Sequence, residues 1–293
     1  MMEIFLIYSL HNEAYSFASA GDKQVPWWSF TKTVIATLTL KCVEQGKIEL
    51  DSKLKGKPYT YRQLLQHTSG LTDYAMLREY HQAVTNGQSP WPCDEMLAKV
   101  QVDDLLFNPG EGWRYSNIGY LFLKQQIEQC YDAPFAEVLD TLFKSVDISN
   151  SALIESSAEF DKLNVSNQSY DPRWCYHGVI AGSVHDAAKF LHLLMSGQLI
   201  SKPMLNRMLT PYKLNFDVGQ RPWKSPAVGL GVMLNCEPEL KTSGHTGQGP
   251  QSCFAAYHFE QINPITITVF EQTHSQAVVE DKAVELAKAF TGR

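Results

Sequence analysis

The stretch WWSFTKTVIATL, which covers residues 27–38, decides how the rest of the chain is interpreted. Ser29 and Lys32 are three residues apart in it, so on a helix their side chains share a face. A serine hydroxyl is a poor nucleophile at its ordinary pKa, and an amine within hydrogen-bond reach can activate it. The pair therefore suggests a serine nucleophile activated by a lysine.

A second pair with the same spacing, Ser52 and Lys55, shows that the pattern alone is weak. It follows the polar residues 46–51 with no apolar helix behind it, so we interpret it as surface loop. Ser29, in contrast, opens a segment with apolar residues at core-facing intervals. We expect that helix to stop at Gly46, a plausible residue just beyond a last helical turn.

Length and charge narrow the class of protein. The 293 residues can form one large domain or two lobes. The formal net charge is −6 at pH 7 and the signs are interspersed, so no basic surface for nucleic acid is expected. A small-molecule or short-peptide substrate is the expected partner, and oligomerisation is left open.

Cysteine and histidine spacing gives no metal or cofactor signal. The six cysteines are scattered without a C-x-x-C pair, and no histidine cluster has zinc-ligand spacing. The apolar run at residues 1–8 lacks the basic start and the cleavage site of a signal peptide, and no run reaches the length of a membrane span. These features favour the cytoplasm, with the periplasm as the alternative if the N-terminus has been trimmed.

Strand patterns lie at both ends of the chain, and helical patterns lie between them. Strands are predicted at residues 3–9 and 14–18 as a hairpin, and at residues 229–234, 252–259 and 264–270. Helices are predicted at residues 61–67, 94–102, 118–130, 134–143, 184–196 and 277–290. The pattern indicates an α/β (α+β) fold whose antiparallel sheet is formed by both chain ends and flanked by helices, beside an all-α lobe.

The same pattern suggests where two lobes would meet. Residues 1–55 and 225–293 would form the sheet lobe, and residues 56–224 the mainly helical lobe, within a single unit. The Ser29 helix would then lie at the boundary between lobes, where small-molecule sites are common.

Two further segments carry candidate site residues. In residues 107–120, a loop rich in Pro and Gly precedes Tyr115 and Asn117, and alone it is an ordinary turn with Asn117 capping a helix. Residues 241–249 indicate a strand end that passes into a Gly-rich turn containing His245, Thr246 and Gly247.

In this order and at this spacing, Ser29-x-x-Lys32, Tyr115-x-Asn117 and His245-Thr246-Gly247 resemble the serine β-lactamase and penicillin-recognising enzyme superfamily. The branch most similar is the one shared by class C β-lactamases, D-alanyl-D-alanine carboxypeptidases, D-aminopeptidases and β-lactamase-like esterases. Residues 64–71, 108–110 and 178–191 extend the match, so the resemblance covers nearly the whole chain and implies a β-lactamase/transpeptidase-like fold.

The resemblance implies that the catalytic residues are Ser29, Lys32, Tyr115, Asn117 and His245. Ser29 would attack a carbonyl carbon and form an acyl-enzyme. Lys32 would have a lowered pKa in a partly buried setting, and Tyr115 would be the general base or a proton shuttle. Whether Lys32 or Tyr115 takes the serine proton is left open. Asn117 would hold Lys32 or a substrate amide.

The resemblance also implies a substrate-binding strand. The backbone N–H groups of Ser29 and Gln248 would form the oxyanion hole, and Thr246 and Gly247 would line it closely. His245 stands where the β-lactamases and carboxypeptidases have a lysine. Because histidine can be neutral at pH 7, recognition of a substrate carboxylate is expected to be weaker.

The predicted function is a serine hydrolase that acts through an acyl-enzyme on ester, amide or β-lactam carbonyls, in the manner of a β-lactamase-like esterase or peptidase. One alternative is a true β-lactamase or DD-carboxypeptidase, and a second is a non-catalytic scaffold of the penicillin-binding type. An α/β-hydrolase is disfavoured because the chain has no G-x-S-x-G elbow.

Overall fold

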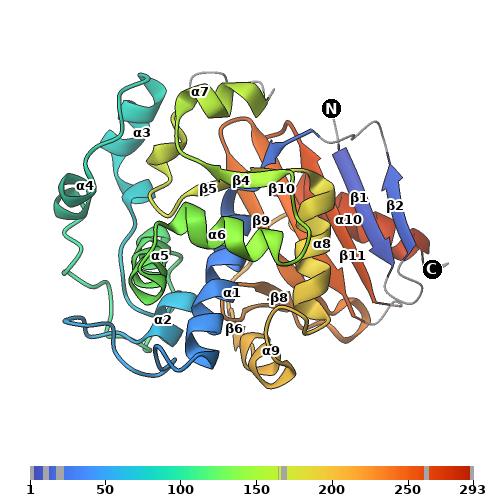
Figure 1. The fold of residues 1–293 in the computed structure, drawn as a ribbon, viewed down its shortest axis with the longest axis horizontal. Helices are drawn as coiled ribbons and strands as arrows, with labels where there is room; N and C mark the ends of the chain where they lie inside the picture. Colours follow the sequence, from blue (N-terminus) through green and yellow to red (C-terminus); the bar gives the residue numbers. More distant parts are fainter. Residues whose placement is uncertain are drawn as a thin grey trace.

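An antiparallel sheet of eight strands forms the centre of the fold, in the order β2-β1-β11-β10-β9-β8-β7-β6 (Figure 1). The computed structural model describes residues 3–8, 13–17, 23–163, 165, 170–260 and 264–290. The strands are β1 (Glu3–Tyr8), β2 (Glu13–Phe17), β6 (Tyr212–Lys213), β7 (Pro226–Val228), β8 (Met233–Asn235), β9 (Thr242–Gly249), β10 (Ser252–Phe259) and β11 (Ile265–Glu271). The expected fold class is confirmed.

The two ends of the chain meet inside this sheet. β1 pairs with β11 from Glu3 opposite Phe270 to Tyr8 opposite Ile265, and it pairs with β2 on its other side. The predicted hairpin is therefore confirmed, although its turn at residues 9–12 lies outside the described residues.

Helices cover both faces of the sheet. Alternate residues of β10 point to opposite faces, as the period of two in a strand requires. Ala255 and Tyr257 pack in the cluster that includes Val279 of α10 (Gln276–Phe290), whereas Phe254 and Ala256 pack in the larger core. Figure 1 shows α8 (Val184–Met195) in front of the sheet and α10 behind it.

The remaining helices lie mostly in the middle of the chain. They are α1 (Thr31–Glu44), α2 (Tyr61–Leu65), α3 (Arg78–Thr85), α4 (Cys93–Lys99), α5 (Asn117–Tyr131), α6 (Phe135–Lys144), α7 (Ser157–Phe160) and α9 (Lys202–Met208). α1 ends before Gly46, whose φ of 69° suits the left-handed residue beyond a helix. Ser116, rather than Asn117, caps α5 by accepting a hydrogen bond from the Gly119 N–H. In the described part of the chain, no helix is long and apolar enough to cross a membrane.

The middle block is not all-α as predicted. It contributes β4 (Ser151–Ile154) and β5 (Val179–Gly182) to a second sheet, in the order β3-β5-β4, with β3 (Val25–Pro26). These strands have two to four residues, too few for a period to be recognised. The lobe boundaries stay a prediction, and β6 of the large sheet lies within residues 56–224.

Two predictions about glycine-rich segments are wrong. Of the strand expected at residues 229–234, residues 229–232 instead connect β7 to β8, and only Met233 and Leu234 lie in a strand; the connection packs on α1 through a hydrogen bond from Thr33 Oγ1 to the Gly231 carbonyl. The turn expected around His245 is the middle of β9. The glycines of β9 do not form a turn. They let the neighbouring strand β10 approach closely: a Cβ on Gly244 would lie 2.0 Å from the Ala256 carbonyl oxygen.

Candidate active site

Ser29 lies where β3 of the small sheet leads into α1. The Trp27 N–H donates to the Ile180 carbonyl at 2.8 Å, and the 3₁₀ turn Trp28–Phe30 then leads into the helix. Trp28 has φ of 45°, which is unusual for a bulky residue, and its indole N–H donates to Ser252 Oγ at 3.0 Å. The anchored backbone leaves Ser29 half-buried on the wall of a cavity.

Lys32 is completely buried one turn after Ser29. Its Nζ lies 3.3 Å from Ser29 Oγ, within hydrogen-bond distance. Burial lowers the pKa of Lys32 to about 7, although the nearby Cys175 and Asp73 act in the opposite direction. Near neutral pH, a substantial fraction of this side chain is therefore the uncharged amine.

His177, which was not predicted as a site residue, is a second partner of Lys32. Its Nε2 lies 2.9 Å from Lys32 Nζ. Burial, reinforced by the charge of Lys32, holds the pKa of His177 well below its ordinary value, so the imidazole is neutral. Its Nδ1 is buried and has no hydrogen-bond partner among the described residues. An isolated histidine beside Gly178 carries no motif that would have indicated this contact.

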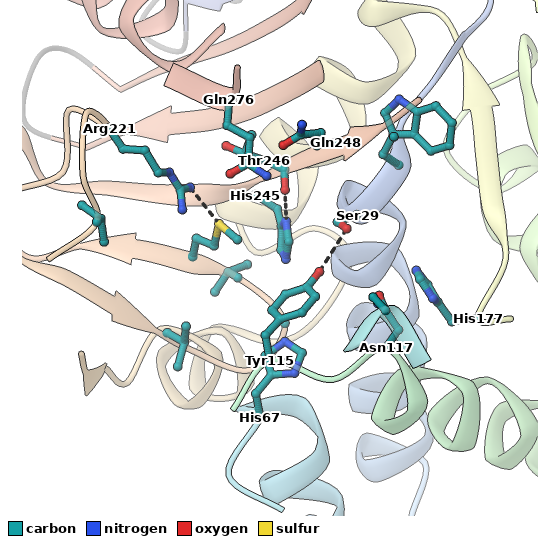
Figure 2. A pocket seen from close by; sticks show the side chains of 18 of the residues that line it. Ser29, His67, Tyr115, Asn117, His177, Arg221, His245, Thr246, Gln248 and Gln276 are labelled. Atoms are coloured by element: carbon teal, nitrogen blue, oxygen red, sulfur yellow. Dashed lines mark hydrogen bonds between the residues drawn. The ribbon is translucent and has the colours of Figure 1, made fainter. Parts of the chain in front are cut away.

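Tyr115 reaches Ser29 from the loop before α5. Its hydroxyl donates to Ser29 Oγ at 3.0 Å, and its ring stacks on His67 with centroids 4.4 Å apart (Figure 2). His67 is held in turn by the Ser116 N–H, which donates to its Nδ1 at 3.1 Å. Desolvation raises the pKa of Tyr115 well above its ordinary value, so the side chain is a protonated phenol.

Asn117 bonds to a buried carboxylate rather than to Lys32. Its Nδ2 donates to Asp73 Oδ1 at 3.2 Å, and its backbone N–H also donates to Asp73. Asp73 accepts a further hydrogen bond from the Ala75 N–H at 2.8 Å, where it caps a 3₁₀ turn. Asp73 was not predicted as a site residue, because a lone aspartate in a loop resembles any turn residue.

β9 runs directly beside the backbone of Ser29. A Cβ on Gly247 would lie 2.5 Å from the Ser29 nitrogen, and one on Gly249 would lie 2.4 Å from the Trp28 ring. Only glycine permits this approach. The side chain of Gln248 is exposed, lines the cavity and donates to the His274 carbonyl at 2.8 Å (Figure 2).

His245 is buried and neutral. Burial and the charge of Lys32 lower the pKa of His245 to about 3. Its Nδ1 lies 2.8 Å from the Thr246 carbonyl oxygen, which can only accept, so the Nδ1 carries the proton and donates.

A buried ion pair lies behind Thr246. Glu280 of α10 is fully buried and accepts from Arg221 Nε at 2.8 Å and from Arg221 Nη2 at 2.5 Å. Thr246 Oγ1 also donates to Glu280, and the Tyr257 hydroxyl donates to it at 3.3 Å. Arg221 and Glu280 were not predicted, because their sequence neighbourhoods carry no motif.

One cavity of about 820 Å³ is lined by Ser29, Tyr115, Asn117, His177, Arg221, His245, Thr246 and Gln248. Figure 2 shows Ser29, Tyr115 and His245 turned toward the same space. Much of the remaining wall is aromatic, formed by Trp28, Tyr74, Tyr80, Trp113, Tyr170, Phe216, Trp223 and Tyr257. Within the described residues, no group of three or more His, Cys, Asp or Glu side chains could hold a metal ion. The arrangement suits nucleophilic attack on a carbonyl carbon by Ser29.

Comparison with known proteins identifies the family of the chain. The family model described as Beta-lactamase matches residues 11–289. A putative fimbrial assembly protein FimD, serogroup D, of Dichelobacter nodosus is 30% identical over 128 residues, which cover 40% of this chain and 32% of that protein. The match thus spans about a third of that relative's length.

Two solved structures share the fold at low identity. The D-amino acid amidase from Ochrobactrum anthropi SV3 superposes with a TM-score of 0.81 and 18% identity, covering 98% of this chain and 95% of that chain. The octameric penicillin-binding protein homologue from Pyrococcus abyssi gives a TM-score of 0.79 and 20% identity, covering 98% and 73%.

Proposed function

The chain belongs to the Beta-lactamase family, and on that basis we propose that it is a serine hydrolase that works through an acyl-enzyme on Ser29. One observation carries the proposal: Ser29 Oγ lies 3.3 Å from Lys32 Nζ and 3.0 Å from the Tyr115 hydroxyl, on the wall of a large cavity. A nucleophile with a base and a proton donor in contact is the arrangement that acyl transfer needs.

Lys32 is the base in this proposal. With its pKa lowered to about 7, its neutral amine has a lone pair that can accept the Ser29 proton as Oγ attacks the carbonyl carbon. Tyr115, a protonated phenol, gives its proton to the leaving group and recovers one from the Lys32 ammonium. The acyl-enzyme and the protonated leaving group are the products of this step. Water then attacks the acyl-enzyme, and the same groups return a proton to Ser29 Oγ.

His177 positions Lys32 for this role. Its imidazole is neutral, so in the tautomer with the proton on Nδ1 the Nε2 atom accepts one N–H of the amine. The lone pair is then free to face Ser29 Oγ. The same acceptor stabilises the ammonium that forms during attack.

The Ser29 and Gln248 backbone N–H groups would bind the oxyanion. The close approach of β9 at Gly247 supports this assignment, because it brings the two backbones together without side-chain interference. Preorganised donors of this kind are worth about 10²–10³ in rate each.

Esters and amides are the preferred substrates of the proposal. The similar fold named a D-amino acid amidase supports amides, and the aromatic cavity supports apolar acyl or leaving groups. Action on β-lactams ranks lower, because His245 is neutral where a cation would bind the carboxylate of such a substrate.

Covalent labelling tests the proposal. The protein is incubated with a fluorophosphonate and its intact mass is measured, with Ser29→Ala as the matched control. We expect one adduct on Ser29 that the variant abolishes. Turnover of p-nitrophenyl esters, amino acid amides and nitrocefin then ranks the substrates. A wild-type protein that gains no mass and hydrolyses none of them would instead be a non-catalytic scaffold.

A further inference from the structure

We infer that His67 is a positioning residue that holds the Tyr115 hydroxyl against Ser29 Oγ by bonding to the chain on both sides of the tyrosine. This inference rests on the proposed function and adds a residue that prepares the same site. The His67 carbonyl accepts from the Arg114 N–H at 2.9 Å, and its Nδ1 accepts from the Ser116 N–H at 3.1 Å. One residue thus fixes both chain neighbours of Tyr115.

The imidazole of His67 also contacts the ring of Tyr115 itself. The two ring centroids are 4.4 Å apart and the ring planes differ by 29°. A second ring, that of Tyr120, lies 5.2 Å from the imidazole, and its hydroxyl donates to the Leu65 carbonyl at 2.9 Å. Figure 2 shows His67 beside Tyr115, whose hydroxyl is turned toward Ser29. The phenol therefore lies against a ring with fixed neighbours, which restricts where its hydroxyl can point.

The hydrogen bond from Ser116 requires a neutral imidazole. A protonated ring carries an N–H on both nitrogens and cannot accept at Nδ1. Burial and the charge of Lys32 hold the pKa of His67 well below its ordinary value, so Nδ1 keeps its lone pair. Ser116 is itself buried. Without this acceptor its N–H would have to move to find another partner, and the adjacent Tyr115 would move with it.

The backbone of His67 has a conformation that glycine adopts more easily. Its φ is 60°, in the left-handed region. Just beyond α2, the His67 N–H donates to the Leu64 carbonyl at 3.3 Å and the Thr68 N–H donates to the Gln63 carbonyl at 2.9 Å. These two bonds form a Schellman motif, whose left-handed position is usually a glycine. The end of the helix therefore does not explain why a histidine is here.

Other left-handed residues that follow helices have different surroundings. Gln101, Asp132 and Asp147 follow α4, α5 and α6 with φ between 48° and 53°, and each of them is exposed. His67 is only 4% exposed, and it lines the cavity. We attribute this difference to the contacts that its side chain makes with Tyr115 and Ser116.

Two substitutions at His67 test the assignment. His67→Gly suits the left-handed backbone and removes both the acceptor and the ring. We expect kcat/KM for ethyl phenylacetate to fall about 10²-fold, as for a misplaced catalytic group. His67→Asn can place Oδ1 near the position of Nδ1 and tolerates a left-handed backbone, so it should recover most of the loss. An unchanged kcat/KM in His67→Gly, or no recovery in His67→Asn, would overturn the inference.

The leaving group separates positioning from a merely structural role. Ethoxide needs a proton from Tyr115 to leave, whereas p-nitrophenolate does not. The deficit of His67→Gly should therefore be severalfold smaller for p-nitrophenyl phenylacetate than for the ethyl ester. Each rate is expressed per Ser29 labelled by fluorophosphonate, so partial loss of folded protein does not affect it. Equal deficits for the two esters would count against a role through the phenol.

A double-mutant cycle shows whether His67 acts through Tyr115. Because the proton donor is already absent in Tyr115→Phe, adding His67→Gly should lower kcat/KM for the ethyl ester by less than about threefold more. A second loss as large as the first would mean that His67 acts independently. Asp132→Gly is the matched control: it also replaces a left-handed residue after a helix, and it should leave kcat/KM for both esters unchanged.

The amide hydrogen of Ser116 gives a readout that does not depend on turnover. Hydrogen exchange followed by NMR should show it protected in the wild type and in His67→Asn, and exchanging at least about tenfold faster in His67→Gly. If the wild type hydrolyses neither ester and is not labelled, the hydrolase proposal fails, whereas this exchange pattern still supports His67 as the residue that holds Tyr115. If the wild type hydrolyses both esters and the exchange pattern is absent, only the inference fails.

Discussion

Lys32 Nζ lies 2.9 Å from Nε2 of His177 and 3.3 Å from Ser29 Oγ, so the ammonium form of the buried amine, which can only donate, has an acceptor in each of them. The rings of Tyr115 and Tyr120 also lie near Lys32 Nζ, with centroids at 5.1 and 5.6 Å. Cys175 and Asp73 raise the pKa of Lys32 by electrostatic interaction at longer range. His67 and His245 lie near enough to be affected by its charge and are themselves neutral. His177 is therefore the one direct acceptor among the described histidines around the lysine.

Replacing His177 should change the pH profile as well as the rate. In the wild type, kcat/KM should rise with pH through about 7, as Lys32 loses its proton. His177→Leu removes an acceptor that stabilises the ammonium, so the pKa of Lys32 should fall and the acid limb should move to lower pH, with kcat reduced about tenfold. His177→Gln keeps an acceptor and should restore both. A variant that loses activity without moving the acid limb would point to a structural role only.

Replacing Lys32 should stabilise the fold in a pH-dependent way. The folded pKa of about 7 lies below the ordinary value of 10.5, so below pH 7 both folded and unfolded chains carry the ammonium and its burial cost is fully present. Between pH 7 and 10.5 the unfolded chain binds more protons, and stability rises. The free energy of unfolding of Lys32→Met should thus exceed that of the wild type by roughly 4 kcal/mol at pH 6, and this difference should shrink toward pH 10. Urea unfolding of both proteins at several pH values measures this, and a gain that does not vary with pH would contradict the buried-amine account.

Tyr115→Phe isolates the phenolic hydroxyl. The ring can keep its stack on His67, so we expect the melting temperature to change little. The proton donor to the leaving group is lost, and kcat should fall about 10²–10³-fold with a smaller change in KM. Steady-state kinetics checks this. The deficit should be smaller for esters with acidic leaving groups, which need no proton, and an equal deficit for all esters would argue against proton transfer.

Gly247→Ala should disturb the oxyanion geometry. Its methyl group would lie 2.5 Å from the Ser29 nitrogen, so β9 must move away. We expect kcat/KM to fall about 10²–10³-fold, as for loss of an oxyanion donor. Gly119→Ala on α5 is a matched control, because its methyl group would make ordinary contacts of 3.5 Å or more with Leu64. Equal kinetic effects of the two substitutions would exclude a special role for the Gly247 approach.

The parts of the site that depend on local geometry could be predicted from the sequence. Ser29 and Lys32 are one helical turn apart, so a helix alone brings them together. Tyr115 and His245 were found because they belong to ordered segments that resemble a known superfamily. The fold class followed from strand patterns at both ends of the chain.

The rest depends on tertiary contacts that leave no local pattern. His177 meets Lys32 across 145 positions, and Arg221 meets Glu280 across 59. Each is a single polar residue among ordinary neighbours. β4 and β5 were missed because a strand of four residues has no readable period. The cytoplasmic location and the oligomeric state stay predictions.

The pairing of β1 with β11 also has a consequence for synthesis on the ribosome. Ser29 emerges before β9, which carries the proposed oxyanion donor of Gln248, and before β11, which pairs with β1. Contacts this distant in sequence form late, since long loops must close first. The proposed hydrolytic activity would therefore appear only after the residues through β11 have been synthesised and can fold with Ser29 and Lys32.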